Sequence, residues 1–147
     1  MNRGRFLLAA LTVWIVRVVL NATFYTKVVG GQWQQIAAAH PGMFRQVVPA
    51  YILTDLIFAL AFTYLFVKVG PALGAGVQGG TKLGILVAIL SPVIGGLYHY
   101  YSVTFLPLSL MLSESVFQII AHAVEGAVAG ATYKATVTPR AESAKAL

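Results

Sequence analysis

The stretch VVPAYILTDLIFALAFTYLFV, residues 47–67, decides the fold class of this chain. Asp55 is its only charged residue. A hydrocarbon core of about 30 Å takes roughly 20 helical residues to cross. Strands of a membrane β-barrel run only about ten residues and alternate between apolar and polar side chains, which this stretch does not. It therefore predicts a transmembrane helix.

Three other segments share this character, so we predict an all-α integral membrane protein with a single domain, residues 1–147. The expected fold is a bundle of four transmembrane helices. Its spans are predicted at residues 6–29, 47–67, 83–105 and 108–133, followed by a polar tail at 134–147. Pro107 leaves room for only a tight turn between the last two spans, so these should be antiparallel neighbours.

The connecting segments carry their own signals. Gly70–Gly80 (GPALGAGVQGG) is predicted to be a flexible connector, and Gly30–Gln46 to be the longest loop, with Trp33 as an interfacial anchor. Pro49 falls in the first turn of its span, where a missing N–H matters little. Pro92 lies inside the third span, where a kink is expected.

The composition supports a membrane location. Hydrophobic residues make up 59% of the 147 residues and charged residues 10%, against about 25% in soluble domains. The net charge of +6 does not indicate nucleic-acid binding, because the cations lie at the ends of apolar runs and form no cluster with interleaved aromatics. The absence of cysteine excludes disulfides and thiolate chemistry. The start resembles a signal peptide, but its apolar run continues beyond Arg17 to Val29, which predicts a retained span.

Lysine and arginine set the predicted orientation. One side of the membrane collects Arg3, Arg5, Lys68, Lys82, Lys134, Arg140 and Lys145, and the other has Lys27 and Arg45. Positive charges are retained on the cytoplasmic face, so both termini should be cytoplasmic. The expected location is the inner (cytoplasmic) membrane, with several passes.

Polar residues within the spans are the candidate functional residues. Each ionisable one costs about 2.5–3.5 kcal/mol at a helix centre on insertion scales. The candidates are Arg17, Asn21, Asp55, His99, Glu114, Gln118, His122 and Glu125. Helical spacing places the last four on one face of the fourth span. Similar stripes are Trp14, Arg17, Asn21 and Tyr25 in the first span, and Ser91, Gly95, Tyr98 and Ser102 in the third. Such stripes should point into the bundle or at a protein partner.

Depth in the membrane suggests which residues could pair. Asn21 and Asp55 lie at the same depth from the outer ends of their spans, with Arg17 one turn deeper, and His99 and Glu114 lie at similar distances from their shared turn. Arg17 with Asp55, and His99 with Glu114, are therefore possible pairs. The foremost interpretation of the first pair is structural, since the two charges neutralise each other and fix the helix packing. A proton or ion path and a contact to a partner subunit or lipid headgroup are the alternatives.

The histidines raise the question of a cofactor. His99 and His122 differ in depth by about 12 Å at 1.5 Å per residue, which disfavours a haem held by both. A single axial contact to haem or chlorophyll stays open for either. His122 and Glu125 have the i,i+3 spacing of a metal-binding pair, but further convergent ligands are lacking, so no metal site is predicted. Apart from bound lipid we expect no cofactor.

Small residues recur every four positions and predict close helix packing. They are Gly80 and Gly84; Ala123, Ala127 and Ala131; and Gly126 and Gly130. The chain also resembles short uncharacterised four-helix bacterial membrane proteins, domains of unknown function. The resemblance rests on Arg5, Asn21, Phe24 and Trp33 followed by three more spans. It implies a topology and no activity.

Three classes of function follow. The favoured one is a small non-catalytic subunit that packs against and stabilises a larger membrane complex, with a photosynthetic or respiratory one as the expected host. Its partners would be the lipid bilayer and other integral membrane subunits. The second class is a small transporter or proton conductor using Asp55, Glu114, His99 and Arg17. The third is a membrane enzyme acting on a lipid or quinone, with His122 and Glu125 as acid and base in a cavity open to the bilayer.

Overall fold

The computed structural model describes residues 1–45 and 47–133, and every regular element among them is helical. The helices are α1 (Arg3–Thr23), α2 (Gly30–Ala39), α3 (Val48–Leu73), α4 (Gly76–Ala88), α5 (Ile94–Ser102) and α6 (Leu108–Thr132). Two π-helical turns, η1 (Phe24–Val28) and η2 (Ile89–Val93), extend α1 and join α4 to α5. The predicted all-helical fold is confirmed. The predicted tail and the lysines and arginine within it lie outside the described residues.

Three helical stretches are long and apolar enough to cross a membrane: Arg3–Val28, Val48–Leu73 and Gly76–Ser102. Helix α6 is not among them, although it has 25 residues. Glu114, Gln118, His122 and Glu125 all lie on it and lower its average hydropathy. The chain is therefore a membrane protein with three candidate spans and a fourth, more polar helix.

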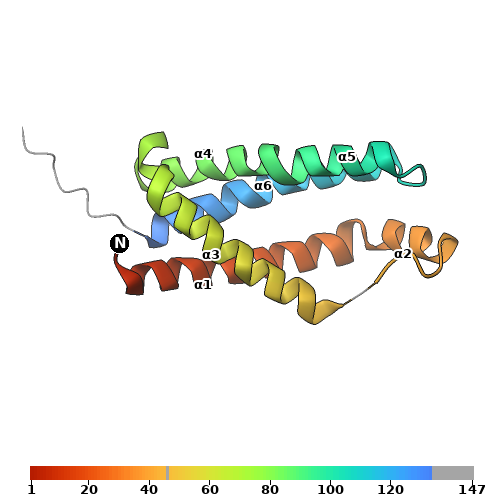
Figure 1. Cartoon of the computed structure of the whole chain (residues 1–147), viewed down its shortest axis with the longest axis horizontal. Coiled ribbons are helices and arrows are strands. Elements are labelled where there is room, and N and C mark those ends of the chain that lie inside the picture. Colours follow the sequence, from red (N-terminus) through yellow and green to blue (C-terminus); the bar gives the residue numbers. More distant parts are fainter. Residues whose placement is uncertain (46, 134–147) are drawn as a thin grey trace, which may run out of the picture.

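Figure 1 shows how the helices are arranged. Helices α1, α6 and the α4–α5 rod run side by side, and α3 crosses them obliquely. The N-terminus, the α3–α4 turn and the last turn of α6 lie at one end, and α2 and the α5–α6 turn lie at the other (Figure 1). The turn between Ser102 and Leu108 is short, and α5 and α6 are the antiparallel neighbours that Pro107 predicted.

The predicted flexible connector at Gly70–Gly80 is wrong. Helix α3 continues through Pro71 to Leu73, and α4 already begins at Gly76, so the third stretch starts seven residues earlier than residue 83. Gly74 and Gly76, both with positive φ, make the tight turn between these helices, while other glycines of the region pack against neighbouring backbone. A Cβ added to Gly80 would overlap the carbonyl of Gly126 on α6, so a side chain there would force the two helices apart.

The same close approach continues along both helices. A Cβ at Gly84 would overlap the His122 carbonyl, and one at Gly130 would overlap the Gly76 carbonyl. The predicted role of Gly80, Gly84, Gly126 and Gly130 in helix packing is confirmed. We call these four residues and Gly76 the glycine contact.

One other prediction about connections needs correction. Gly30–Gln46 is not one loop, because Gly30–Ala39 forms α2, which follows the π-turn η1 after the single residue Val29. The position predicted for a kink, Pro92, lies within the π-turn η2, whose wider hydrogen-bonding pattern accommodates the missing N–H. Pro49 does occupy the first turn of α3, as predicted.

The bundle has two separate cores. The first contains Ala9, Val13, Ala59, Phe62, Phe66, Leu83, Ala129 and Tyr133. It lies at the end of the bundle that holds the N-terminus, which we call the glycine end (Figure 1). The second contains Phe24, Val29, Leu106, Leu110 and Met111 and is packed by Trp33, Phe105 and Phe117. It lies at the opposite end, which we call the aromatic end.

The hydroxyl groups show how the helices suit a lipid environment. Seven serine and threonine side chains donate to the backbone carbonyl four residues earlier, at 2.7–2.9 Å. They are Thr12, Thr26, Thr54, Ser102, Ser113, Ser115 and Thr132. Each bond satisfies the donor within its own helix, so these residues can face hydrocarbon without an unpaired hydroxyl.

Candidate functional site

The charged centre of the molecule is Arg17, which joins three helices. Its Nε lies 2.7 Å from Oδ1 of Asp55 on α3. Its Nη1 lies 3.1 Å from Oε1 and 3.3 Å from Oε2 of Glu125 on α6. The expected Arg17–Asp55 pair is therefore present, and Glu125 is a second acidic partner that the sequence did not assign to Arg17. We call these three residues the charged triad.

Neighbouring side chains hold the charged triad in place. The Cζ of Arg17 lies 3.8 Å from the centroid of the Phe58 ring, a cation–π contact. Asn21, one turn along α1, donates from Nδ2 to Oδ1 of Asp55 at 3.5 Å. Trp14, one turn before Arg17, donates its indole N–H to the Ile52 carbonyl at 3.2 Å. Residues 14, 17 and 21 of the predicted α1 stripe thus face α3.

His122 lies beside the charged triad but is not a member of it. Its Nδ1 lies 2.8 Å from the Gln118 carbonyl oxygen on its own helix, and its ring meets the Phe58 ring edge-on at 5.1 Å. The residue is 1% exposed, and Glu125 is 0% exposed. Because His122 is enclosed by packed side chains, a planar macrocycle has no access to it in this bundle. Of the two directions predicted for the α6 stripe, into the bundle or toward a partner, His122 and Glu125 take the first.

The second predicted pair, His99 with Glu114, is not formed. Among the described residues the ion pairs join Arg17 to Asp55 and to Glu125. Glu114 instead accepts a hydrogen bond from the Trp33 indole N–H at 2.8 Å, while His99 is exposed on α5. Trp33 reaches Glu114 from α2, which follows η1 at the aromatic end. The role of Trp33 as an interfacial anchor stays a prediction, and its indole N–H is bonded to Glu114 on α6.

The polar stripe of the third span faces outward. Ser91, Gly95, Tyr98 and Ser102 are all exposed, and Tyr98 is 72% exposed. A Cβ placed on Gly95 or Gly96 meets nothing within 4 Å. Within the α4–α5 rod the glycines that contact α6 belong to α4, and those of α5 do not touch it. Of the two directions predicted for this stripe, into the bundle or toward a partner, the first is wrong.

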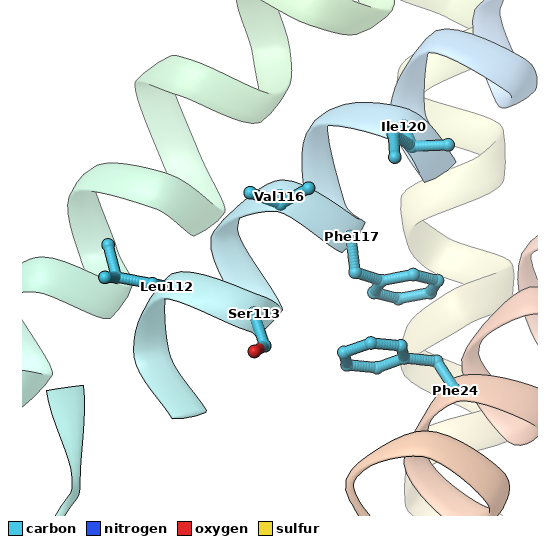
Figure 2. Close-up of a pocket in the computed structure, with 6 residues that line it drawn as sticks. All are labelled: Phe24, Leu112, Ser113, Val116, Phe117 and Ile120. Carbon is cyan, nitrogen blue, oxygen red and sulfur yellow. The ribbon is translucent and has the colours of Figure 1, made fainter. Parts of the chain in front are cut away.

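An open apolar groove of about 490 Å³ runs along α6. Figure 2 shows its lining, in which the Phe24 and Phe117 rings stack face to face. Their centroids are 3.9 Å apart and their planes differ by 2°. Leu112, Ser113, Val116 and Ile120 complete the wall. His122 and Glu125, the proposed acid and base of a membrane enzyme, do not line it.

Within residues 1–45 and 47–133, no group of three or more histidine, aspartate or glutamate side chains is arranged to hold a metal ion. The pairing of His122 and Glu125 as metal ligands has no geometric support, because both oxygens of Glu125 face Arg17. Comparisons of the chain with protein-family models, curated proteins and solved structures find no match. The resemblance based on Arg5, Asn21, Phe24 and Trp33 therefore stays a prediction.

Proposed function

We propose that this chain is a small non-catalytic membrane subunit that packs the outward face of α5 against a helix of another integral membrane protein. We call this surface, made of Ser91 in η2 and of Gly95, Tyr98 and Ser102 in α5, the α5 face. The host complex we expect is an energy-transducing one, photosynthetic or respiratory. The outward orientation of the α5 face is the observation that carries the proposal.

The chemistry of the α5 face suits helix packing. Ser91 and Gly95 are four residues apart and exposed, and small residues at this spacing let two helix backbones approach closely. Tyr98 and Tyr101, which are 72% and 79% exposed, border these small residues. Aromatic side chains next to a small-residue depression supply the large contact area that interfaces use. Within this chain the same small-residue chemistry is used between α4 and α6.

The interior supports the same proposal. Arg17 uses Nε and Nη1 within the chain, and Asp55 and Glu125 both accept from it. These three side chains fix α1, α3 and α6 to one another and do not face the lipid. The membrane-embedded groups that are left for a partner therefore lie on the surface.

The topology we propose has four spans, with α6 as the fourth. Its polar side chains face the bundle, and the lipid-exposed side carries Leu112, Val116 and Ile120. Arg3, Lys68 and Lys82 lie toward the glycine end of their helices, whereas Lys27 and Arg45 belong to the aromatic end. We assign the glycine end to the cytoplasmic side of an inner membrane.

The experiment compares two adjacent glycines. Gly95→Leu and Gly96→Leu each add a side chain where nothing lies within 4 Å, so both variants should fold like the native chain. Gly95 lies on the α5 face, whereas Gly96 is turned about 100° away. The two proteins are extracted from the native membrane in mild detergent, and their complexes are weighed by native mass analysis.

We expect the native chain and Gly96→Leu to travel at fixed stoichiometry with the same larger assembly, and Gly95→Leu to travel alone. A native chain that runs as a small homo-oligomer would contradict the proposal. Equal retention of both variants would contradict the assignment of the α5 face. Because the chain has no cysteine, Gly95→Cys offers a clean cross-linking position to identify the neighbour, with the exposed α4 residue Leu86→Cys as control.

A second candidate function is a proton or ion conductor, and one observation favours it. Glu114, Gln118, His122 and Glu125 follow one another along the inward face of α6, from the aromatic end to the charged triad. Between the charged triad and the glycine end, the apolar first core, with Phe62, Phe66 and Leu83, interrupts this row of polar side chains. A conductor would need a further polar path through this core. The test is proton or ion flux into liposomes that contain the purified chain, which should disappear with Asp55→Asn or Glu114→Gln.

A further inference from the structure

We propose that the charged triad is a proton-binding site, in which Arg17 and Asp55 form the ion pair and Glu125 carries a bound proton. This inference goes beyond the proposed subunit function and does not depend on the α5 face. It rests on a charge count in a buried space: one guanidinium faces two carboxyl groups.

The surroundings supply no second cation. Among the described residues, the ionisable or charged groups facing Glu125 are Arg17 from α1, Asp55 from α3 and His122 from α6 itself. Helix α4, which also packs on α6, presents Gly80, Gly84 and Leu83 there, and its Lys82 is exposed. With both acids ionised, the cluster would carry one uncompensated negative charge in an apolar interior. A buried group in this position takes up a proton instead of remaining charged.

His122 does not compensate for the excess charge. Its Nδ1 lies 2.8 Å from the Gln118 carbonyl oxygen, which requires a proton on Nδ1 and is satisfied by the neutral ring. A cationic ring would add a second positive charge beside the Phe58 ring, over whose face the Arg17 guanidinium already lies. The neutral tautomer is therefore the one that the contacts support.

The geometry also indicates which of the two carboxyl groups holds the proton. Asp55 makes the short contact to Arg17, 2.7 Å from Nε, and receives a second donor from Asn21. The side chain of Asp55 is 16% exposed and that of Glu125 is 0% exposed. Glu125 shares a single Nη1 between its two oxygens at 3.1 and 3.3 Å. The carboxylate with the shorter and more numerous donors retains the charge, and the deeper one retains the proton.

The test measures the proton directly, by infrared spectroscopy of the full chain in phosphatidylcholine vesicles at neutral pH. A protonated carboxyl group has a C=O stretch well separated from the carboxylate bands. We expect such a band in the native chain and its complete loss in Glu125→Gln. The control is Glu114→Gln on the same helix, whose acid is bonded to Trp33 and which should leave the Glu125 band in place.

A second variant keeps Glu125 and changes only the charge count. In Asp55→Asn, Arg17 has one acid left, so Glu125 should release its proton and the band should vanish although Glu125 is still present. If Glu125→Gln does not fold, this spectrum decides alone. No protonated carboxyl band in the native chain, a band unchanged in Glu125→Gln, or a band retained in Asp55→Asn would each overturn the proposal.

Discussion

The two ends of the bundle are built by opposite means. At the glycine end, α4 and α6 meet backbone to backbone, and Cβ atoms would overlap opposite carbonyls at three successive levels. At the aromatic end, the helices are separated by rings, with Phe24 stacked on Phe117 and Trp33 reaching across to Glu114. Both π-turns lie away from the glycine contact, and η1 supplies Phe24 to the core of the aromatic end. Backbone contact tolerates no added atoms, whereas side-chain contact can repack.

The charged triad lies between these two ends, and breaking it should have the largest effect. Arg17→Leu leaves Asp55 and Glu125 buried without their cation, and removing one partner of a buried ion pair costs about 3–5 kcal/mol. The free energy of unfolding in mixed micelles measures this loss. Lys82→Leu, which removes an exposed cation from α4, should change it by less than about 0.5 kcal/mol. Similar losses for the two variants would show that the triad does not connect the ends.

The glycine end should be the more sensitive of the two to a single methyl group. Gly80→Ala places a Cβ against the Gly126 carbonyl, and we expect a loss of about 1–3 kcal/mol in unfolding free energy. Gly95→Ala should change stability in the opposite direction, by up to about 1 kcal/mol, because alanine favours the helix and nothing lies within 4 Å. The sign difference between the two variants is the decisive measurement.

The aromatic end should lose stability locally. Trp33→Phe keeps a ring but removes the N–H that Glu114 accepts, for an expected loss of about 1.5 kcal/mol. Hydrogen exchange should quicken over α2 and stay unchanged over the glycine contact. If exchange quickens equally at both ends, the two cores unfold as one unit and the comparison fails.

The smallest effect is expected in the groove. Phe117→Leu removes the stacking on Phe24 while retaining an apolar side chain, and aromatic pairs contribute about 0.5–1.5 kcal/mol beyond their buried area. Thermal unfolding should show a modest decrease in the midpoint. Val116→Ala in the same groove lacks a ring partner and serves as the control, with a smaller decrease.

The sequence predicts the helical class well, because long apolar runs admit few alternatives. It also predicts the Arg17–Asp55 pair, since the two residues lie within one helical turn of the same depth in consecutive spans. It misses Glu125 as a partner of Arg17, because the angle at which α6 approaches α1 depends on glycine packing elsewhere. The depth of a residue in its span is not enough to tell which of Asp55, Glu114 and Glu125 contacts Arg17.

Glycine was the main source of error in the connections. The run Gly70–Gly80 has the composition of a flexible linker, and only the carbonyls of α6 reveal it as a packing surface. Similarly, the stripe at Ser91, Gly95, Tyr98 and Ser102 has the spacing of an inward face. Gly80 and Gly84 already occupy the side of α4 that contacts α6. The π-turn at Pro92 then rotates the following residues about the helix axis relative to a regular α-helix.

The charged triad also constrains how the chain enters the membrane. Arg17 precedes Asp55 by 38 residues and Glu125 by 108. During synthesis the first helix therefore presents an arginine to the bilayer before either acid has emerged, at a cost of about 2.5–3.5 kcal/mol. Helices α1 and α3 should consequently integrate as a pair, with the first helix retained at the insertion machinery until Asp55 arrives. The order of synthesis makes Asp55 the partner for insertion, and Glu125 joins when α6 completes the bundle.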